Sequence, residues 1–238
     1  LWDAPSDRNR LIEHLRTTGE CENRPVVLRR KDGSTVECVL SASTLDIDGM
    51  PHMISLTRDV TQQRALEAQL TRDAETDALT GVANRRHFLA RAEDEMQQSV
   101  RSGRGFSVAV IDIDGFKQIN DICGHAAGDA ALEHFARVAE RRTREVDLLG
   151  RLGGDEFGLL LPHTGIDVAY AIVDRIRRDL LGEPVPGLDL AEPLVITFSA
   201  GVAARRSSTE TLQEVVAAAD SALYKAKEQG RNRTIMVP

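Results

Sequence analysis

Residues 153–157 read Gly153-Gly154-Asp155-Glu156-Phe157, and this pentapeptide constrains the fold more than any other part of the sequence. Apolar runs stand on both sides of it, at 148–149 and 157–161. Two strand-like runs joined at a glycine pair predict a β-hairpin, because glycine readily takes the positive φ that tight turns require. The turn presents bare backbone beside two carboxylates, which suits a polyanion held through a divalent metal. For so short a motif, an exposed acidic turn is the commoner structure.

Size and composition indicate an ordinary globular protein. The chain has 238 residues, of which 42% are hydrophobic and 28% charged, enough for two modest domains. No apolar run approaches the roughly 20 residues that span a bilayer, so we expect no membrane contact from this chain. A net charge of −7 disfavours a nucleic-acid-binding protein, which would carry a basic face. An anionic substrate would therefore need metal and a few local cations.

The cysteines favour a cytoplasmic location. Cys21, Cys38 and Cys123 are widely spaced, and their spacing fits neither a disulfide framework nor a zinc site. Because the first residue is Leu1 rather than Met, we expect the chain to be part of a longer protein, whose membrane anchor, if it has one, would lie upstream.

Residues 1–60 predict a small antiparallel sheet with one helix. The helix has apolar residues at helical spacing, and Asp32-Gly33 and Asp48-Gly49 predict hairpin turns in which both central residues take positive φ. The expected elements are a helix over 7–18 and strands over 26–30, 35–43 and 52–57. About 60 residues make a marginal core, so we expect this segment to be the second half of a larger domain.

Residues 61–76 are polar and favour a helix, with Thr61 as its cap and Leu66 and Leu70 on one face. We interpret this segment as a helical linker. No apolar heptad is sustained over three repeats, so the pattern leaves open whether the helix pairs as a coiled coil or is simply solvated.

Residues 77–238 alternate helix and strand signals. Helices are expected over 85–101, 126–144, 167–181 and 211–228, and strands over 106–113, 146–152, 157–161, 194–203 and 234–237. This order predicts an α+β domain with a central mixed, partly antiparallel sheet flanked by helices.

A second acidic position lies at the end of the strand predicted over 106–113. Alternation along this strand puts Val108, Val110, Asp112 and Asp114 on one face. If the strand neighbours the hairpin, Asp112 converges with Asp155 and Glu156, and three such carboxylates repel unless divalent cations neutralise them. Two metal ions there would suit phosphoryl or nucleotidyl transfer. Taken alone, Asp112 is also a common strand-end turn former.

Several motifs, in order along residues 72–238, resemble the GGDEF family of diguanylate cyclases. They are Asp77-Ala78-Leu79-Thr80-Gly81, Asn84-Arg85-Arg86, the run 112–121, Gly124-His125, Gly128-Asp129, the pentapeptide, Tyr224-Lys225-Ala226-Lys227 and Gly230-Arg231-Asn232. The resemblance implies a fold akin to nucleotidyl cyclase and polymerase palm cores, and condensation of two GTP into cyclic di-GMP with release of two pyrophosphates. The hairpins of residues 1–60 and the exit Thr57-Arg58-Asp59-Val60-Thr61 resemble the C-terminal part of a PAS sensor domain, although a generic three-stranded cap would look similar.

The resemblance also implies the roles of individual residues. Asp112, Asp155 and Glu156 would hold two Mg²⁺ or Mn²⁺ ions together with the carbonyl of Ile113, and Asp155 or Glu156 would take the 3′-hydroxyl proton. GTP would bind at Phe116, Lys117, Asn120, His125, Asp129, Gly153, Gly154, Lys227 and Arg231. An ionised carboxylate accepts from the N1 and N2 donors of guanine, so Asp129 favours GTP over ATP. By themselves, Asn120 and Asp129 are ordinary helix-start residues, and Lys227 and Arg231 ordinary surface cations.

Arg144 and Asp147 have the spacing and the offset of the family's inhibitory product site, with Arg175 at the position of its second arginine. A surface ion pair at a helix end would give the same pattern. The resemblance further implies a homodimer, because one GTP site cannot make a two-fold symmetric product. Two alternatives remain open, namely a non-catalytic receptor for GTP or cyclic di-GMP, and a signalling dimerisation module.

Overall fold

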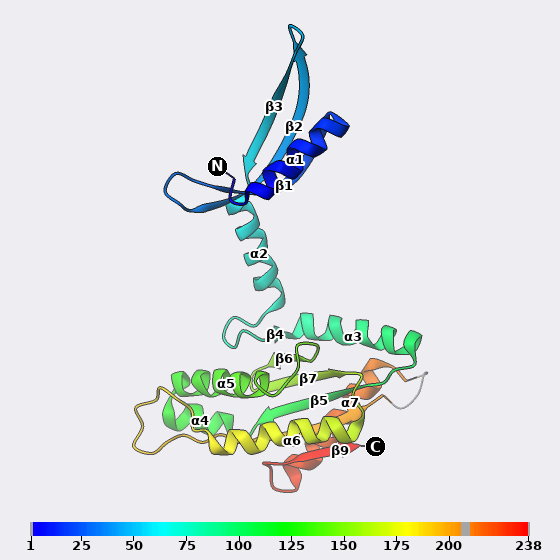
Figure 1. The fold of residues 1–238 in the computed structure, drawn as a ribbon. Helices are drawn as coiled ribbons and strands as arrows, with labels where there is room; N and C mark the ends of the chain where they lie inside the picture. Colours follow the sequence, from blue (N-terminus) through cyan, green and yellow to red (C-terminus); the bar gives the residue numbers. More distant parts are fainter. Residues whose placement is uncertain (1, 206–209, 238) are drawn as a thin grey trace. The chain divides into compact units, whose positions relative to one another are not determined.

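The computed structural model of the chain describes residues 2–205 and 210–237. It divides into two compact units, Leu1–Arg72 and Asp73–Pro238, and each unit contains its own sheet (Figure 1). The division falls within the helix α2, Thr61–Glu75, the segment expected to be a linker. No helix in the described part of the chain is both long and apolar enough to cross a bilayer.

The first unit is a three-stranded antiparallel sheet with one helix packed on it. Its elements are α1 (Pro5–Thr18), β1 (Glu20–Arg29), β2 (Thr35–Ile47) and β3 (Met50–Asp59), and β2 is the central strand. Leu11 and Leu15 of α1 lie in a small core against alternate residues of β2, from Val36 to Ala42. The expected helix and strands are confirmed, with each strand longer than its apolar pattern indicated. All ten residues of the edge strand β3 are exposed.

The two Asp-Gly turns of this unit differ. Asp48 and Gly49 have φ of 55° and 79°, the pair of left-handed residues predicted for a tight hairpin. In the turn at Asp32-Gly33 only Gly33 has a positive φ. The backbone N–H of Arg30 donates to the carbonyl of Ser34, so this connection is longer than the one at Asp48-Gly49. The prediction of two left-handed residues was wrong at Asp32, whose carboxylate instead accepts from the Ser34 N–H and hydroxyl.

Helix α2 begins at Thr61, but the Thr61 hydroxyl does not cap it. That hydroxyl accepts from the backbone N–H of Glu37 in β2, while the Asp59 carboxylate accepts from the Thr61 N–H. Arg64 adds an ion pair to Glu37, with 2.6 Å between Nη1 and Oε2. The start of α2 is therefore bound to the first sheet. Leu66 and Leu70 are both more than half exposed, so the pairing of this helix stays a prediction.

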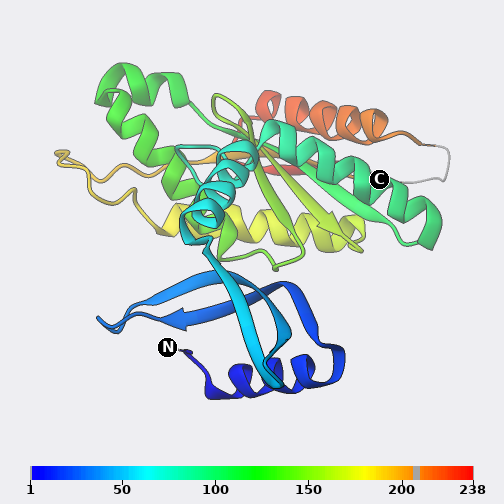
Figure 2. The ribbon, with the colours of Figure 1, turned by 90° about the horizontal axis from the view of Figure 1, so that it is seen from above.

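The second unit is built on a six-stranded mixed sheet of order β4-β6-β7-β5-β8-β9 (Figures 1 and 2). Its strands are β4 (Ala83–Asn84), β5 (Phe106–Ile113), β6 (Leu148–Gly153), β7 (Glu156–Pro162), β8 (Phe198–Ala204) and β9 (Thr234–Val237). Its helices are α3 (Arg85–Ser102), α4 (Phe116–Cys123), α5 (His125–Glu140), α6 (Ile166–Gly182) and α7 (Leu212–Glu228). The pairs β4–β6 and β8–β9 are parallel and the others antiparallel. The α+β prediction is confirmed.

Alternate residues of the central strand β5 serve two hydrophobic cores. Ala109, Ile111 and Ile113 pack under α5 and α6, whereas Val108 and Val110 pack under α3 and α7. Every residue of β5 is buried, as expected for a strand with a neighbour on each edge and helices on both faces. By the same alternation Asp112 belongs to the face covered by α3 and α7.

Five details of the second unit differ from the sequence-based expectations. Helix α5 ends at Glu140 rather than at 144, because Arg144–Asp147 form a turn in which the Arg144 N–H donates to the Asp147 carboxylate. Strand β6 consequently starts at Leu148, and β8 starts only at Phe198. Helix α4 and the two-residue strand β4 were not expected. The spacing of Phe116, Ile119 and Cys123 is a helical signal that could have identified α4.

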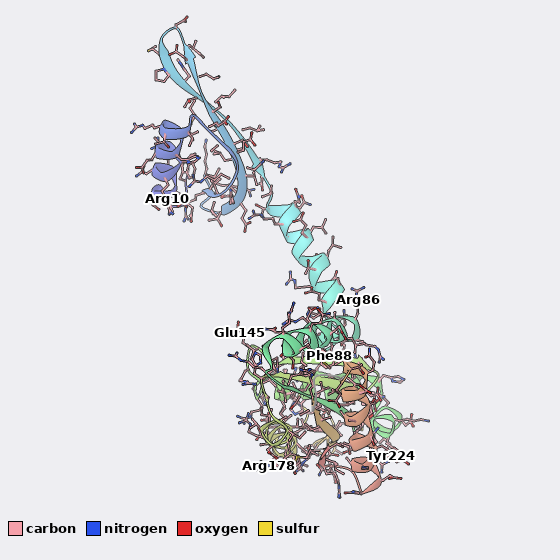
Figure 3. All side chains as sticks on the ribbon, turned by 90° about the vertical axis from the view of Figure 1, so that its right-hand side faces the viewer. Arg10, Arg86, Phe88, Glu145, Arg178 and Tyr224 are labelled. Atoms are coloured by element: carbon pink, nitrogen blue, oxygen red, sulfur yellow. The ribbon has the colours of Figure 1, made fainter. Side chains whose placement is uncertain are left out.

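Glycines allow helices to approach the sheet closely. Phe88, on α3, is labelled in Figure 3 and lies over Gly150 and Gly158. A β-carbon at Gly150 would stand 2.8 Å from the Phe88 side chain, and one at Gly158 would stand 2.6 Å from its ring. On β8, a β-carbon at Gly201 would stand 2.0 Å from the backbone oxygen of Ala219 in α7. The backbone of α7 cannot move away from a β-carbon by changing rotamer, as a side chain could. The absence of a β-carbon at Gly201 therefore allows the short distance between α7 and β8.

We therefore expect Gly201→Ala to destabilise the second unit by about 3 kcal/mol or more, the upper end of the cost of overpacking. Gly182→Ala is the matched control, because a β-carbon there meets nothing within 4 Å, and alanine favours a helix. Urea unfolding followed by circular dichroism measures both variants. Equal midpoints for Gly201→Ala and the parent would contradict this account of the packing.

Candidate active site

The pentapeptide forms a hairpin whose loop is Gly154-Asp155, not the glycine pair. Gly153 is the last residue of β6 and pairs with Glu156, the first residue of β7. The two glycines have φ of 152° and 51°, and a register shift lies between Arg151 and Gly153. Asp155 therefore lies at the tip of the loop, whereas Glu156 belongs to a strand. This geometry separates the two carboxylates that are adjacent in sequence.

Arg151 holds the hairpin loop in place. Its Nε and Nη2 donate to the carbonyl of Gly154 at 2.9 and 2.8 Å, and its Nη1 lies 3.1 Å from Oδ1 of Asp77. Burial by itself would raise the pKa of Asp77, but hydrogen bonds from Thr80 and Arg151 bring it below its ordinary value. Arg151 thus ties the loop to the start of the domain. Its position two residues before the glycine pair is the only signal for this role in the sequence.

Asp112 lies directly opposite Glu156 in the pairing of β5 with β7. The residue is only 8% exposed, and its Oδ2 is 2.7 Å from Nζ of Lys227 on α7. Burial raises the pKa of Asp112, Lys227 opposes that shift, and the charges of Asp155 and Glu156 add to it. The strand register therefore brings Asp112 beside Glu156, whereas a metal site formed by all three acids stays a prediction.

Among the described residues, no three His, Cys, Asp or Glu side chains stand close enough to hold a metal ion as they are. The Asp112 carboxylate is instead paired with Lys227. The donor set still fits a hard divalent cation, because carboxylate and carbonyl oxygens are its usual ligands. Such a cation would offset both the burial that chiefly raises the pKa of Asp112 and the smaller repulsion from Asp155 and Glu156. Ile113 is adjacent, and its N–H donates to the Asp155 carbonyl at 3.2 Å.

The residues expected to contact guanine lie where α4 meets α5. Asn120 is half-buried in α4, and its Oδ1 would stand 2.1 Å from a β-carbon at Gly128 of α5. Glycine at 128 therefore lets the two helices come together. His125 and Asp129, in the first turns of α5, are both exposed and available to a ligand. Phe116 is half-buried against the core, and Lys117 beside it is exposed.

The expected phosphate-end cations come from α7 and the turn that follows it. Lys227 lies in the last turn of α7, and Arg231 is exposed just beyond the helix. Lys227 lines a cavity of about 350 Å³ together with Arg85, Glu156, Asp220 and the exposed Tyr224, which Figure 3 labels. Burial raises the pKa of Asp220, and the charge of Glu156 raises it further. Sequence reasoning missed Asp220, although the spacing 220, 224 and 227 puts these side chains on one helix face.

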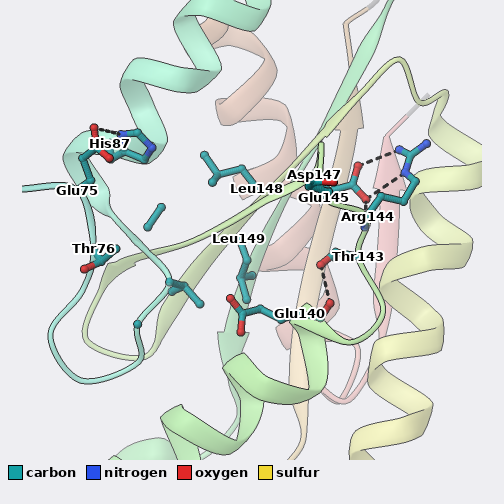
Figure 4. A pocket seen from close by; sticks show the side chains of 13 residues that line it. Glu75, Thr76, His87, Glu140, Thr143, Arg144, Glu145, Asp147, Leu148 and Leu149 are labelled. Carbon is teal, nitrogen blue, oxygen red and sulfur yellow. Dashed lines mark hydrogen bonds and ion pairs between the residues drawn. The ribbon is translucent and has the colours of Figure 1, made fainter. Parts of the chain in front are cut away.

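The residues of the expected inhibitory site form a compact ion pair. Arg144 Nη2 lies 2.8 Å from Asp147 Oδ1, and its Nε donates to Oδ2 at 3.2 Å. The Asp147 side chain is 1% exposed, while that of Arg144 is 55% exposed. Arg175 of α6 donates to the carbonyl of Arg142 at 3.0 Å, so it lies beside the same turn. Arg144 and Asp147 also line a cavity of about 410 Å³ that extends to Glu75 and His87 (Figure 4).

Comparison with known proteins identifies the family to which this chain is similar. Residues 74–233 match the family described as "Diguanylate cyclase, GGDEF domain". Diguanylate cyclase DgcM of Escherichia coli is 39% identical over 204 residues, 86% of this chain and 48% of that protein. Response regulator PleD of Caulobacter vibrioides is 37% identical over 162 residues, 68% of this chain and 36% of that protein. The chain therefore covers less than half the length of either relative.

Solved structures agree with the sequence comparison. The coiled coil and GGDEF domain of DgcB from Caulobacter crescentus, in complex with c-di-GMP, superposes with a TM-score of 0.71 at 33% identity, covering 75% of this chain and 93% of that one. Diguanylate cyclase SiaD from Pseudomonas aeruginosa, in complex with its activator SiaC, gives 0.67 at 39% identity, with coverage of 74% and 66%. The hairpin, the opposed carboxylates and the matched residues together establish that this chain belongs to the GGDEF family of diguanylate cyclases.

Proposed function

We propose that this protein condenses two GTP into cyclic di-GMP and releases two pyrophosphates. The observation that carries the proposal is Asp112, buried and directly opposite Glu156, the residue that follows the loop of the family's signature hairpin. The names of DgcM and of the other relatives support the activity, and the DgcB complex supports binding of the product by a domain of this fold.

Divalent metal is part of the proposal. Asp112, Asp155, Glu156 and the carbonyl of Ile113 would hold Mg²⁺ or Mn²⁺, two ions in each site. When bound, these ions neutralise charge on the phosphates and orient the oxygens that attack and leave. Lys227, which forms an ion pair with Asp112 in the structure, would also contribute positive charge to the triphosphate. Asp155 or Glu156 would accept the 3′-hydroxyl proton of the attacking ribose.

The GTP itself would lie between α4 and the hairpin. Asn120 and Asp129 would read the guanine edge, since a carboxylate matches two adjacent donors and an amide can both donate and accept. His125 stands beside them at the start of α5. Three kinds of group would surround the phosphates. They are the backbone amides near Phe116 and Lys117, the backbone of Gly153 and Gly154, and the cations Lys227 and Arg231. Phosphate groups favour such backbone N–H donors and flexible cations.

Catalysis by this arrangement needs a second copy of the domain. Each site holds one GTP, whereas the product contains two nucleotides related by a two-fold axis. Two domains facing each other as a homodimer would each supply one GTP, and each 3′-hydroxyl would attack the α-phosphate held by the partner. The activity would then depend on how the two copies are oriented.

We further propose that residues 1–60 are the C-terminal part of a PAS-like sensor domain that acts on this orientation through the linker helix. In the second unit, the Asn84 side chain donates to the carbonyls of Ala74 and Thr76, at the end of α2. Asp77, two residues after the end of α2, forms an ion pair with Arg151, and Arg151 also binds the carbonyl of Gly154 in the hairpin loop. These contacts support a short mechanical connection between the linker and the active site.

Product inhibition completes the proposal. The exposed guanidinium of Arg144, fixed by the buried Asp147 carboxylate, would bind a phosphate and stack on a guanine of cyclic di-GMP, with Arg175 beside it. A location in cytoplasm, where GTP is available, fits the three free cysteines of the chain.

The decisive test is incubation with GTP and Mg²⁺ followed by chromatography. We expect the parent to form cyclic di-GMP and Glu156→Gln to be slower by about 100-fold or more, because amide cannot serve as base or anionic ligand. If the parent binds GTP but forms no product, a non-catalytic receptor is favoured instead. If it forms a dimer that neither binds GTP nor makes product, a signalling dimerisation module is favoured.

Gly154→Ala should abolish most turnover while the fold persists. A β-carbon at 154 meets no protein atom within 4 Å, so the protein has room for it. In the proposed site it would stand against the nucleotide, and displacement of a reactant by about 1 Å costs about 100-fold. Gly187→Ala is the control, because it has a similar positive φ of 78° and the same open surroundings. Both variants should lose similar stability, and near-normal turnover of folded Gly154→Ala would refute the role of this glycine.

Arg144→Ala should relieve product inhibition without lowering the initial rate. Loss of a charged hydrogen bond to phosphate weakens binding by about 10- to 100-fold, so the inhibition constant of added cyclic di-GMP should rise by that factor. Arg142→Ala, two residues away and also exposed, should remain as sensitive as the parent. If added product inhibits the parent and Arg144→Ala equally, the inhibitory site lies elsewhere.

A further inference from the structure

The second acid of the strand end, Asp114, has partners unlike those of Asp112. Its Oδ1 accepts from the Ser199 hydroxyl at 2.7 Å, and its Oδ2 accepts from the Thr197 hydroxyl at 2.8 Å. The same Oδ2 accepts from the backbone N–H of Asn232 at 3.0 Å. Asp114 therefore joins the end of β5 both to the β8 segment and to a turn more than a hundred residues away in sequence.

That turn has an unusual backbone. Gly230, Arg231 and Asn232 have φ of 109°, 61° and 45°, so two consecutive residues with side chains lie in the left-handed region. Such a conformation persists only where surrounding contacts hold it. The Arg231 N–H donates to the Ala226 carbonyl at 3.0 Å, which binds the turn to the end of α7.

Asn232 is held from two directions. Its N–H donates to Asp114, and its Oδ1 accepts from Nη1 of Arg177 on α6 at 3.1 Å. Arg177 is in turn fixed by Asp174, with 2.8 Å between Nε and Oδ1. The N–H that Asp114 accepts belongs to the peptide bond between Arg231 and Asn232. The hydrogen bonds that join Asn232 to Asp114 and Arg177 therefore set the direction in which the exposed Arg231 side chain leaves the turn.

We infer that Asp114 is a positioning residue for the phosphate end of the nucleotide. It acts through hydrogen bonds to the backbone of the 230–232 turn, and so determines where Arg231 places its guanidinium. The ligand of Arg231 rests on the proposed function, whereas the connection from Asp114 to the turn does not. Asp114 thus differs in role from Asp112, although both end the same strand.

The test measures binding of a non-hydrolysable GTP analogue with Mg²⁺ by calorimetry on the whole chain. Asp114→Ala should weaken binding about tenfold, as expected for a displaced charged hydrogen bond. Asp114→Asn keeps an acceptor oxygen and should restore most of the affinity. The surface control Asp189→Asn, at an exposed loop position, should bind like the parent. In an Arg231→Ala background, Asp114→Ala should cause no further loss, because the side chain it positions is already absent.

Hydrogen exchange measured by mass spectrometry tests the hold of Asp114 on the 230–232 turn separately from the binding of GTP. Asp114→Ala should speed exchange in the peptide containing residues 230–234, whether or not nucleotide binds. If Asp114→Ala exchanges faster there than the parent, but the parent binds no GTP, then Asp114 still holds the turn and the proposed function is refuted. Unchanged exchange there, or additive losses of affinity in the double variant, would overturn the role of Asp114. If Asp114→Ala does not fold, Arg177→Met releases Asn232 from the other side and must give the same two effects.

Discussion

The pairing register of β5 with β7 is the constraint on which the rest of the site depends. It sets Asp112 directly across from Glu156. Like charges at opposed positions of an antiparallel pair are unfavourable, and burial adds to the cost at Asp112. The sheet tolerates this because β5 is buried along its whole length, with hydrophobic cores on both faces that fix its register. A slip of one residue would exchange the two faces and move Asp112 into the core under α5 and α6.

The groups around this pair are held by contacts that are distant in sequence. Gly201 allows α7 to approach β8 closely, and α7 carries Lys227 to within 2.7 Å of Asp112. Arg151 fixes the Gly154 carbonyl and Asp77 together, so that the hairpin loop and the start of the domain share one anchor. Several independent contacts, rather than one, therefore hold the groups around Asp112 and Glu156 in place.

Much of the fold follows from pattern. The period of two in β5, the helical periods of α3, α6 and α7, and the hairpin at 153–157 each gave an element close to the observed one. Two of the errors share one cause, namely side chains that bond to nearby backbone. Asp147 captures the Arg144 N–H and ends α5 early, and Asp32 captures Ser34 and lengthens its turn. Such local competition leaves little trace in hydrophobic periodicity.

By itself, the sequence determined the family, the fold class and the residue types of the candidate site, because its motifs are many and keep their order. Only the tertiary structure decided the geometry of those residues. It placed Asp155 at a loop tip and Glu156 in a strand, although they are neighbours in the chain. It also separated Asp112, beside Lys227, from Asp114, which holds Asn232. The physical reason is that strand alternation assigns a face, whereas the partner on that face comes from segments about a hundred residues away.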